Sequence, residues 1–414
     1  MNRRNRPLDG VVVLDLGQVY QGPYATYMMA RAGATVIKIE PPGGEPTRQR
    51  EDISRGSGVP FAMFNSHKKC ITLDLKTEHG KRILKKLAVK ADVLLENYAP
   101  GVMDRLGIGW SVLHEINPRL VYASGSGFGL SGPDGDRPAM DITVQAASGM
   151  MSVTGFPDGP PVKAGPSIVD FLSGAHLYAG VLTALYERNF TQVGRFVEIA
   201  MQETVYHSLA SNLVYYYDFG EVPPRTGNQH GGRSAAPYNV YATKDGHIAI
   251  IGIKDVHWTN LLQVMGREEL MQDKRLATKV ERVRHIDEVD AIVGDWMKNV
   301  TRDEACALLS KHKVPHAPVR DAVEVTHDAH MHERGFLEWL DHPQFGRIAV
   351  ADSPLRIHGA DRLPVMPSAR LGEHTHEVIT SVLDVSEEQY QQWQAAGAFG
   401  AATPKKVEPD TGRK

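Results

Sequence analysis

Cysteine, net charge and long apolar runs are all scarce in this chain, and each shortage excludes a class of protein. Among 414 residues only Cys70 and Cys306 are cysteines, too few for a disulfide framework and suited to a reducing compartment. The formal net charge is −3, so no broad basic field favours nucleic acid or an anionic membrane. The apolar run 11–14 ends at Asp15, which makes it too short for a signal peptide, and we expect no window of transmembrane length. These features predict a cytoplasmic protein without nucleic acid or membrane partners.

The length predicts two domains, because 414 residues are too many for one compact core. Patterns of buried strands occur at 11–16, 34–40, 71–75, 92–95, 120–124 and 195–200. A helix expected from about Tyr24 to Ala32 lies between the first two, and the order strand, helix, strand indicates a βαβ unit in a parallel sheet. We therefore predict an α/β fold with a Rossmann-like, doubly wound large domain.

A second, smaller domain is indicated by the turn-rich segment 221–234 and by the residues after it. Residues 239–253 predict a hairpin around Asp245 and Gly246, and after it we expect helices only, near 255–265, 285–299 and 301–312. A strand near 346–350 and a helix near 374–384 suggest a return to the large domain. The predicted division is 1–224 for the first part of the large domain, 225–330 for a small α+β domain, 331–400 for the C-terminal return and 401–414 for a disordered tail.

Asp170 is the carboxylate best suited to catalysis. It precedes an apolar helix that begins with small residues, among them Ser173, Gly174 and Gly180. Such an aspartate is more often a helix N-cap than a catalytic group. However, the helix dipole keeps a carboxylate at this end ionised, and the small residues leave space for a large ligand beside it. An ionised, accessible aspartate can attack an activated carbonyl group.

Polar side chains also follow three of the predicted strands. Gln21 follows the first strand, Lys76 the third, and Asn97 and Tyr98 the fourth, with Arg105 on the next helix. Open parallel sheets bind ligands beyond the carboxyl ends of their strands, and this set suits an anionic ligand that carries a base. A capping loop with a surface arginine explains the fourth-strand residues equally well by themselves. Recurrence at three strand ends favours a ligand rim.

Three further patterns concern cofactors, metals and loops. The glycines in 125–132 are followed by turns and not by a helix, which excludes the dinucleotide fingerprint. His327, His330 and His332 match no metal-ligand spacing, so we expect no metal site. The loop 227–232 could be an interdomain turn or a mobile lid over an active site, and the sequence alone favours the turn.

The chain resembles the class III CoA-transferase family, which includes formyl-CoA transferase, the carnitine CoA-transferases and α-methylacyl-CoA racemase. The resemblance is carried, in order, by LDGVVVLDLGQVYQGPYAT, GATVIKIEPPGGEPTR, FAMFNSHKKCITLDLKTEHGK, ADVLLENYAPGVMDRLG, INPRLVYASGSGFG and TGFPDGPPVKAGPSIVDFLSGAHLYAGVLTALYER. It implies a Rossmann-like large domain, a small domain, and a ring-shaped chain that interlocks with a second copy as a homodimer.

The resemblance also implies roles for single residues. The aspartate that matches Asp170 is the nucleophile of the transferases. Six residues match positions that contact CoA: Tyr20, Gln21, Lys76, Asn97, Tyr98 and Arg105. Pro41 replaces a frequent arginine, so we expect an adenine or phosphate contact either to differ or to be made by Lys38 or Arg48. The family's glycine-rich loop is only partly kept, at His230, Gly231 and Gly232, where backbone N–H groups could stabilise an oxyanion; this departure disfavours a small acceptor of the oxalate type.

Met140 separates the transferase and racemase branches of the family. Racemases carry a histidine there, directly before an aspartate, and methionine cannot shuttle a proton. We therefore expect a CoA-transferase that moves CoA from an acyl-CoA donor to a carboxylic acid through an aspartyl-CoA thioester on Asp170, with the CoA thioester as substrate and no permanently bound cofactor. Succinyl-CoA and a dicarboxylate are the hypothesised pair, because His230, Arg233, Tyr238 and Arg137 could hold a second carboxylate.

Three alternatives stay open at this point. Tyr215, Tyr216 and Tyr217 would equally allow an aromatic acid as acceptor. An acyl-CoA racemase or epimerase would exchange the α-proton of its substrate without transferring CoA. A non-catalytic subunit of a hetero-oligomeric CoA-transferase would be inactive when purified alone, although the retention of Asp170 speaks against that role.

Overall fold

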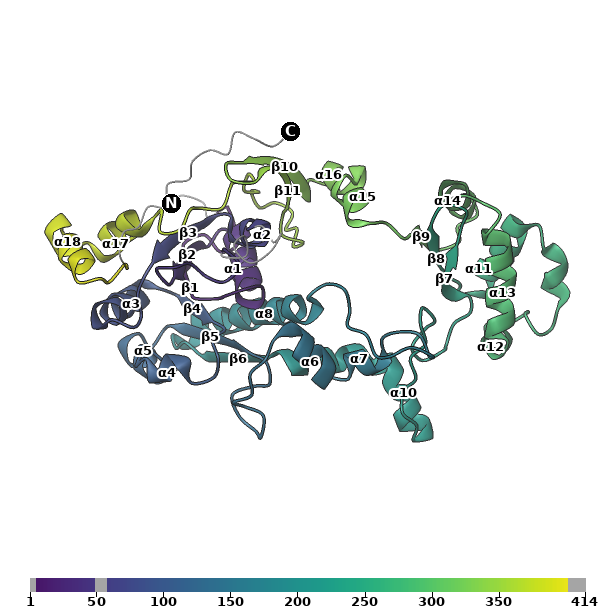
Figure 1. Cartoon of the computed structure of the whole chain (residues 1–414), viewed down its shortest axis with the longest axis horizontal. Coiled ribbons are helices and arrows are strands. Elements are labelled where there is room, and N and C mark those ends of the chain that lie inside the picture. Colours follow the sequence, from purple (N-terminus) through teal and green to yellow (C-terminus); the bar gives the residue numbers. More distant parts are fainter. Residues whose placement is uncertain (1–4, 49–57, 401–414) are drawn as a thin grey trace. The chain divides into compact units, whose positions relative to one another are not determined.

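The computed structural model describes residues 5–48 and 58–400, which form two compact units (Figure 1). Of the described residues, the large unit comprises 5–48, 58–144, 167–204 and 329–400, and the small unit comprises 145–166 and 205–328. The guanidinium group of Arg225 ties the two segments of the small unit together, because it donates to the backbone carbonyls of Phe156 and Gly159. The small unit thus includes 145–166 and 205–224, which the sequence analysis assigned to the large domain. The predicted tail 401–414 lies outside the described residues.

A six-stranded parallel sheet forms the centre of the large unit, in the order β3-β2-β1-β4-β5-β6. Its strands are β1 (Val12–Asp15), β2 (Thr35–Glu40), β3 (Lys68–Thr72), β4 (Val93–Glu96), β5 (Val121–Ser126) and β6 (Phe196–Ala200). This is the order of a Rossmann-type sheet, whose direction of winding reverses between β1 and β4. The predicted doubly wound fold is confirmed.

Helices cover both faces of this sheet, as Figure 1 shows. One face packs against α3 (Glu78–Lys90), α5 (Trp110–Ile116), α17 (Thr375–Leu383) and α18 (Glu387–Ala395), and the other against α1 (Gln21–Arg31) and α8 (Ile168–Thr191). Successive strand residues point to opposite faces. Accordingly, Leu14 and Leu94 lie in the first core, whereas Val13 and Val93 lie in the second.

Helix α1 and strand β3 both begin a few residues earlier than expected. Helix α1 begins at Gln21 and not near Tyr24, because proline is tolerated in a first helical turn and Pro23 lies there. Strand β3 begins at Lys68, three residues before the expected 71. Lys68 is buried beside the carboxylate of Asp15. Because lysines are usually exposed, the sequence pattern did not include this residue in the strand.

Helix α8 corrects one expectation about apolar runs. By length and composition alone it could cross a membrane, so the prediction that no window reaches this length is wrong. The helix packs against α1, β5 and β6, and Leu177, Val181 and Leu185 contribute to the core on that face. Burial against the sheet accounts for these apolar residues of the helix.

The small unit contains a three-stranded antiparallel sheet of β7 (Tyr238–Ala242), β8 (His247–Ile251) and β9 (His316–Pro318). The hairpin predicted around Asp245 and Gly246 is confirmed. The expectation of helices only beyond it is wrong, because β9 pairs with β8 through Ile248 and Pro318; a three-residue strand is too short to give a pattern. Helices α11 (Asp255–Met265), α13 (Ile286–Met297) and α14 (Arg302–Lys311) lie close to their predicted positions.

The remaining elements complete the two units. The C-terminal return begins with a hairpin of β10 (Leu337–His342) and β11 (Gly346–Ala351), which includes the strand expected near 346–350. The other helices are α2 (Val59–Asn65), α4 (Val102–Arg105), α6 (Asp141–Ala147), α7 (Met150–Val153), α9 (Met201–Tyr206), α10 (Ala210–Phe219), α12 (Lys279–Arg284), α15 (Ala322–Thr326) and α16 (Ala329–Glu333).

Candidate active site

Asp170 is the third residue of α8, so the expected helix start after it is wrong. The helix begins at Ile168, and its N-cap residue Ser167 makes no side-chain capping hydrogen bond. Asp141 supplies the cap from another segment: its Oδ1 accepts from the backbone N–H groups of Val169 (2.9 Å) and Asp170 (3.3 Å). These bonds satisfy two of the N–H groups that every helix start leaves without an intrahelical partner. The carboxylate of Asp170 lies in the same first turn, where the helix dipole favours its ionised form.

Aromatic rings pack around the residue after Asp170. The ring of Phe171 stacks on Tyr20, with centroids 5.6 Å apart and planes 22° from parallel. It also meets Tyr24 edge-on, at 5.1 Å, and Phe64 at 5.3 Å. The first turn of α8 is therefore joined to the start of α1 and to the end of α2 by ring contacts.

The small residues after Asp170 serve helix packing, and not ligand access as expected. A Cβ atom on Gly174 would lie 2.7 Å from the carbonyl oxygen of Gln21, so only glycine allows α1 this close. Ser173 is fully buried, and a Cβ atom on Gly180 would meet Val197 of β6 at 2.8 Å. The space beside Asp170 is thus filled by the protein itself on these sides.

The predicted rim residues lie at the carboxyl edge of the sheet. Tyr20 and Gln21 follow β1, and the exposed Lys76 lies between β3 and α3. After β4 come Asn97, Tyr98 and, at the end of α4, the exposed Arg105. The carboxyl ends of parallel strands share one edge, so the fold brings these residues to the side of the sheet where α1 and α8 begin.

Two rim residues are less accessible than expected. Gln21 is 2% exposed, and its amide lies against Gly125 of β5, where a Cβ atom would be 2.5 Å from the Gln21 Oε1. The amide of Asn97 is hydrogen-bonded to the backbone of Gln18 through both of its polar atoms. Tyr98 is half-buried, and burial raises the pKa of its hydroxyl to about 12, which keeps it a hydrogen-bond donor.

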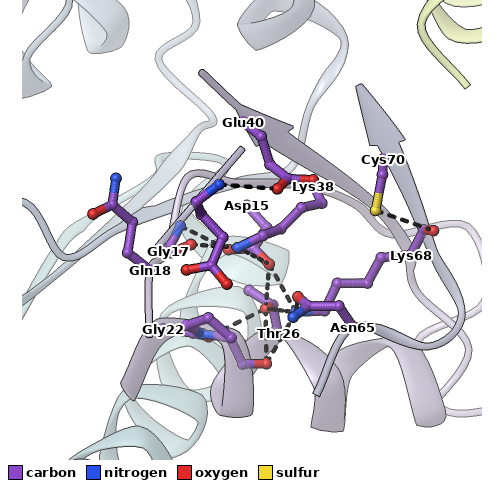
Figure 2. Close-up of polar contacts among 12 residues, drawn as sticks. Asp15, Gly17, Gln18, Gly22, Thr26, Lys38, Glu40, Asn65, Lys68 and Cys70 are labelled. Carbon is purple, nitrogen blue, oxygen red and sulfur yellow. Dashed lines mark hydrogen bonds and ion pairs between the residues drawn. The ribbon is translucent and has the colours of Figure 1, made fainter. Parts of the chain in front are cut away.

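A cluster of buried charged side chains lies behind this rim (Figure 2). The ammonium group of Lys68 has four partners, with distances of 2.8 to 3.0 Å: the side chains of Asp15, Thr26 and Asn65 and the carbonyl of Pro23. Lys38 lies 4.0 Å from the same carboxylate. Burial would raise the pKa of Asp15, but the charges of Lys38 and Lys68 outweigh it and hold that pKa below its ordinary value. Burial lowers the pKa of Lys68 to about 8.

Neither Lys38 nor Arg48 is placed to replace the missing arginine at Pro41. The side chain of Lys38 is fully buried and donates to the carbonyl of Gly17. Arg48 forms a bidentate ion pair with Glu40, at 2.8 and 2.9 Å, and donates to a backbone carbonyl. Both cations already have partners inside the large unit, which favours the alternative that this ligand contact differs in this chain.

Comparison with known proteins decides the family. The model of CoA-transferase family III matches residues 8–375. The chain belongs to CoA-transferase family III. It is 36% identical to a formyl-CoA:oxalate CoA-transferase of Streptomyces avermitilis, over 95% of this chain and 100% of that protein. It is 35% identical to a succinyl-CoA–D-citramalate CoA-transferase of Chloroflexus aurantiacus, over 95% and 98%.

A solved structure supports the same assignment. The crystal structure of a CAIB/BAIF family protein from Brucella suis superimposes with a TM-score of 0.81 at 32% identity, covering 92% of this chain and all of that one. The resemblance seen in the sequence is confirmed, and the chain is an enzyme of the CoA-transferase type. Members of CoA-transferase family III use CoA thioesters as substrates, so an acyl-CoA and a carboxylic acid are the substrate classes to consider.

The glycine-rich loop of this family III chain is anchored within the small unit. Asp290 of α13 accepts hydrogen bonds from Gln229 in the loop (2.9 Å), from Asn239 (2.7 Å) and from the hydroxyl of Tyr241 (2.6 Å). Burial, with Asp290 beside it, raises the pKa of Tyr241 and keeps that hydroxyl a donor. The loop is therefore held by a carboxylate in its own unit.

Close packing explains why glycine stands at two loop positions. A Cβ atom on Gly231 would lie 2.6 Å from the side chain of Asn212, and one on Gly232 would lie 2.8 Å from the carbonyl of Ser211. Both neighbours belong to α10. The ring nitrogen Nδ1 of His230 accepts from the backbone N–H of Gly232 at 3.2 Å, which fixes the imidazole against the loop.

We expect replacement of Asp290 by alanine to destabilise the small unit by about 3 kcal/mol, because hydrogen bonds to a charged group contribute roughly 1.5–3 kcal/mol each and are not additive. Replacement of Tyr241 by phenylalanine removes one donor only and is expected to cost about 1.5 kcal/mol, the lower end of that range. Urea unfolding measures the loss of unfolding free energy in both variants, and hydrogen exchange in residues 227–241 shows whether the loss is located in the loop and its anchor. Equal stability of the Asp290 variant and the wild type would contradict the anchoring role.

Sequence analysis missed two features of the site: the capping role of Asp141 and the buried cluster around Asp15. The cap acts across 28 residues of sequence, and no local pattern marks it. The cluster had a signal, because Asp15, Lys38 and Lys68 each stand in or beside an apolar strand pattern. Charges that are buried with a strand need partners of opposite sign, and these three are the ones that the sheet brings together.

Proposed function

We propose that Asp170 carries CoA as a thioester between an acyl-CoA donor and a carboxylic acid acceptor. The observation that carries this proposal is the position of Asp170 in the first turn of α8, at the sheet edge where the predicted CoA-contacting residues lie. Those residues remain Tyr20, Gln21, Lys76, Asn97, Tyr98 and Arg105. Membership of CoA-transferase family III supports the reaction class.

Four nucleophilic attacks complete the proposed cycle. The carboxylate of Asp170 attacks the donor thioester carbonyl and expels CoA as a thiolate, which leaves a mixed anhydride of Asp170 and the donor acid. The thiolate attacks the aspartyl carbonyl and releases the donor acid. The acceptor carboxylate then attacks the aspartyl-CoA thioester, and the released thiolate attacks the acceptor carbonyl of the second anhydride and restores Asp170. One thioester is consumed and one is formed, so ATP is not required.

Each attack produces an oxyanion that needs hydrogen-bond donors. Backbone N–H groups are suited to this role because they cost no reorganisation during the reaction. Those of Gly231 and Gly232 remain the candidates from the sequence, although the N–H of Gly232 donates to His230 Nδ1 in this structure and would have to exchange that partner for the oxyanion. The side chain of Met140 is 60% exposed and cannot move a proton, which disfavours the racemase alternative.

For the substrates, we propose succinyl-CoA as donor and a dicarboxylic acid as acceptor. The named substrates of the two relatives support a dicarboxylate, since oxalate and citramalate each carry two carboxyl groups. The succinyl-CoA–D-citramalate relative also supports the donor. The partly kept glycine-rich loop disfavours oxalate as acceptor, whereas the similarity to the formyl-CoA:oxalate relative favours it. Oxalate and citramalate are therefore the first two acceptors to compare.

We further propose a cytoplasmic enzyme that forms an interlocked homodimer from ring-shaped chains. The family resemblance supports this assembly, and so do large exposed aromatic side chains, which a second copy could cover. Tyr186 and Phe190 of α8 are 68% and 72% exposed, and Tyr216 and Tyr217 of α10 are 60% and 68% exposed. The two cysteines fit a reducing compartment.

Mass spectrometry of the protein after incubation with succinyl-CoA alone tests the proposed function. We expect an adduct on Asp170 that hydroxylamine or borohydride converts to a stable derivative, and we expect none in an Asp170→Ala variant. Absence of any modification in a protein that still binds CoA would contradict the covalent mechanism. Exchange of the substrate α-proton in heavy water would then test the racemase alternative.

A further inference from the structure

The turn between β1 and α1 has a strained backbone. Val19 has φ +62°, in the left-handed region that a β-branched residue strongly disfavours. Such conformations persist only where surrounding structure enforces them, and they concentrate at functional sites. The residues of this turn, 17–19, connect the buried Asp15 to Tyr20, the first aromatic residue of the site.

Side chains from other segments hold the backbone of this turn. The carboxylate of Asp15 accepts from the N–H of Gly17 (2.8 Å), and the ammonium group of Lys38 donates to the carbonyl of the same glycine. Glu45 accepts from the N–H of Val19 (3.0 Å). All three of these charged side chains are essentially buried, so water does not replace them.

Asn97 makes the most specific contact with the turn. Its Oδ1 accepts from the N–H of Gln18 at 2.7 Å, and its Nδ2 donates to the carbonyl of Gln18 at 3.0 Å. Both polar atoms of one amide thus bind both polar groups of one residue, the neighbour of the strained Val19. This pair of bonds fixes the orientation of the two peptide planes on either side of Gln18.

The turn is connected to Asp170 by a short series of packed groups. Tyr20 follows Val19 directly and is the N-cap residue of α1. Its ring stacks on Phe171 at 5.6 Å, and Phe171 is the neighbour of Asp170 in the first turn of α8. The carbonyl of Gln21 also lies against Gly174, one helical turn further on. A change in the turn would therefore shift the surface on which the first turn of α8 rests.

We propose that Asn97 is a positioning residue, which holds the Gln18–Val19 turn and thereby fixes Tyr20 against Phe171 and the first turn of α8 for attack by Asp170. This inference rests on the proposed function of Asp170. It differs from the role that the family resemblance implies for Asn97, a direct contact with CoA, because both polar atoms of the amide are already bonded to Gln18. Glu45 and Lys38 support the same turn from its other sides.

A double-mutant cycle between Asn97 and Val19 separates the two roles. We expect Asn97→Ala to slow labelling of Asp170 by saturating succinyl-CoA by about 30-fold, since misplacement of a reacting group by 1 Å can cost about 100-fold. The KM for succinyl-CoA should change by less than about twofold, because an interaction that acts on the chemical step lowers kcat alone. Glycine adopts positive φ without strain. In a Val19→Gly variant, the turn therefore no longer needs Asn97 to hold residue 19 in a strained conformation.

Rescue by Val19→Gly is the decisive result. In the Val19→Gly background, we expect Asn97→Ala to lower the labelling rate only about threefold, compared with about 30-fold in the wild type. The two substitutions would then not be additive, as is usual for residues that act through each other. Thermal unfolding of the four proteins should show coupling of the same sign. Where Asn97→Ala does not fold, Asn97→Asp replaces it in the cycle, because it keeps the acceptor for Gln18 N–H and loses only the donor.

Two outcomes would overturn the positioning role. An equal fractional loss in both backgrounds would show that Asn97 does not act through the turn. A tenfold rise in KM at unchanged kcat would assign Asn97 to direct CoA binding. A wild type that acquires no label at all would instead refute the proposed function, and the positioning role with it, so the two failures are distinguishable.

Discussion

Replacing Asp170 with alanine is expected to lower CoA transfer by about 10⁴-fold or more, because removal of a covalent nucleophile eliminates the intermediate and leaves only binding effects. The fold should persist, since the hydrogen bond from residue 170 to Asp141 uses the backbone N–H and survives the substitution. The transfer rate from succinyl-CoA to a panel of dicarboxylic acids measures the loss. Calorimetry should show that the variant still binds CoA.

A matched control distinguishes the nucleophile from a general loss of charge. Asp158 is exposed in the small unit, and Asp158→Ala is expected to transfer CoA at the wild-type rate. Asp170→Asn is a weaker test, because slow deamidation would restore the carboxylate. Transfer by Asp170→Ala at more than about one hundredth of the wild-type rate would refute the covalent role, since loss of a general base alone costs about 10²–10⁴-fold.

Replacing Lys68 with methionine is expected to destabilise the large unit by about 3–5 kcal/mol, the usual cost of removing one partner of a buried ion pair. Both side chains of the pair are fully buried, with 2.8 Å between Lys68 Nζ and Asp15 Oδ2. The substitution also removes the donor to Thr26 and Asn65. Lys38, at 4.0 Å, remains as the only other cation in contact with Asp15 among the described residues.

The adjacent lysine provides the control for this prediction. Lys69 pairs with Glu377 at 2.6 Å, but their side chains are 42% and 56% exposed. Exposed pairs contribute about 0–1 kcal/mol, so Lys69→Met should change the unfolding free energy by no more than that. Urea denaturation at pH 7 compares the two variants with the wild type, and equal losses would contradict the distinct role of Lys68.

The same measurement at lower pH tests the electrostatic origin of the effect. The pKa of Asp15 lies below its ordinary value of 3.8, so the folded state binds its proton more weakly than the unfolded state. The stabilisation is present in full above that ordinary value and is lost as the pH falls through the folded-state pKa. The difference between the wild type and Lys68→Met is therefore expected to shrink as the pH falls below 3.8.

Features set by local patterns could be predicted from the sequence. The parallel strands are buried on both faces, which gives apolar runs of the right length, and Asp245 with Gly246 marks the hairpin of the small unit. Strand ends then located the rim, because the carboxyl edge of such a sheet is where its ligands bind. Asp170 was selected from a different local pattern, a carboxylate beside the start of an apolar helix, and its role remains a proposal.

Features set by partners far apart in sequence could not be predicted in this way. Gly174 suggested open space beside Asp170, but it is small because α1 packs there. Lys68 belongs to a strand although it is charged, because Asp15 lies on β1 of the same sheet. Asn97 was correctly placed near the rim, whereas its contact with Gln18 depends on a turn 79 residues earlier.

The last described residues complete the core on one face of the sheet. Val378, Ile379, Tyr390, Trp393 and Phe399 pack there with residues from β1 to β4. Chains are synthesised from the N-terminus, and domains begin to fold as they emerge. The part of this face that α17 and α18 cover must therefore stay exposed until residues 375–399 have left the ribosome. A nascent or truncated chain that ends before 375 covers this face with α3 and α5 only and exposes the apolar side chains that α17 and α18 would bury, which makes it a natural target for chaperones and proteases.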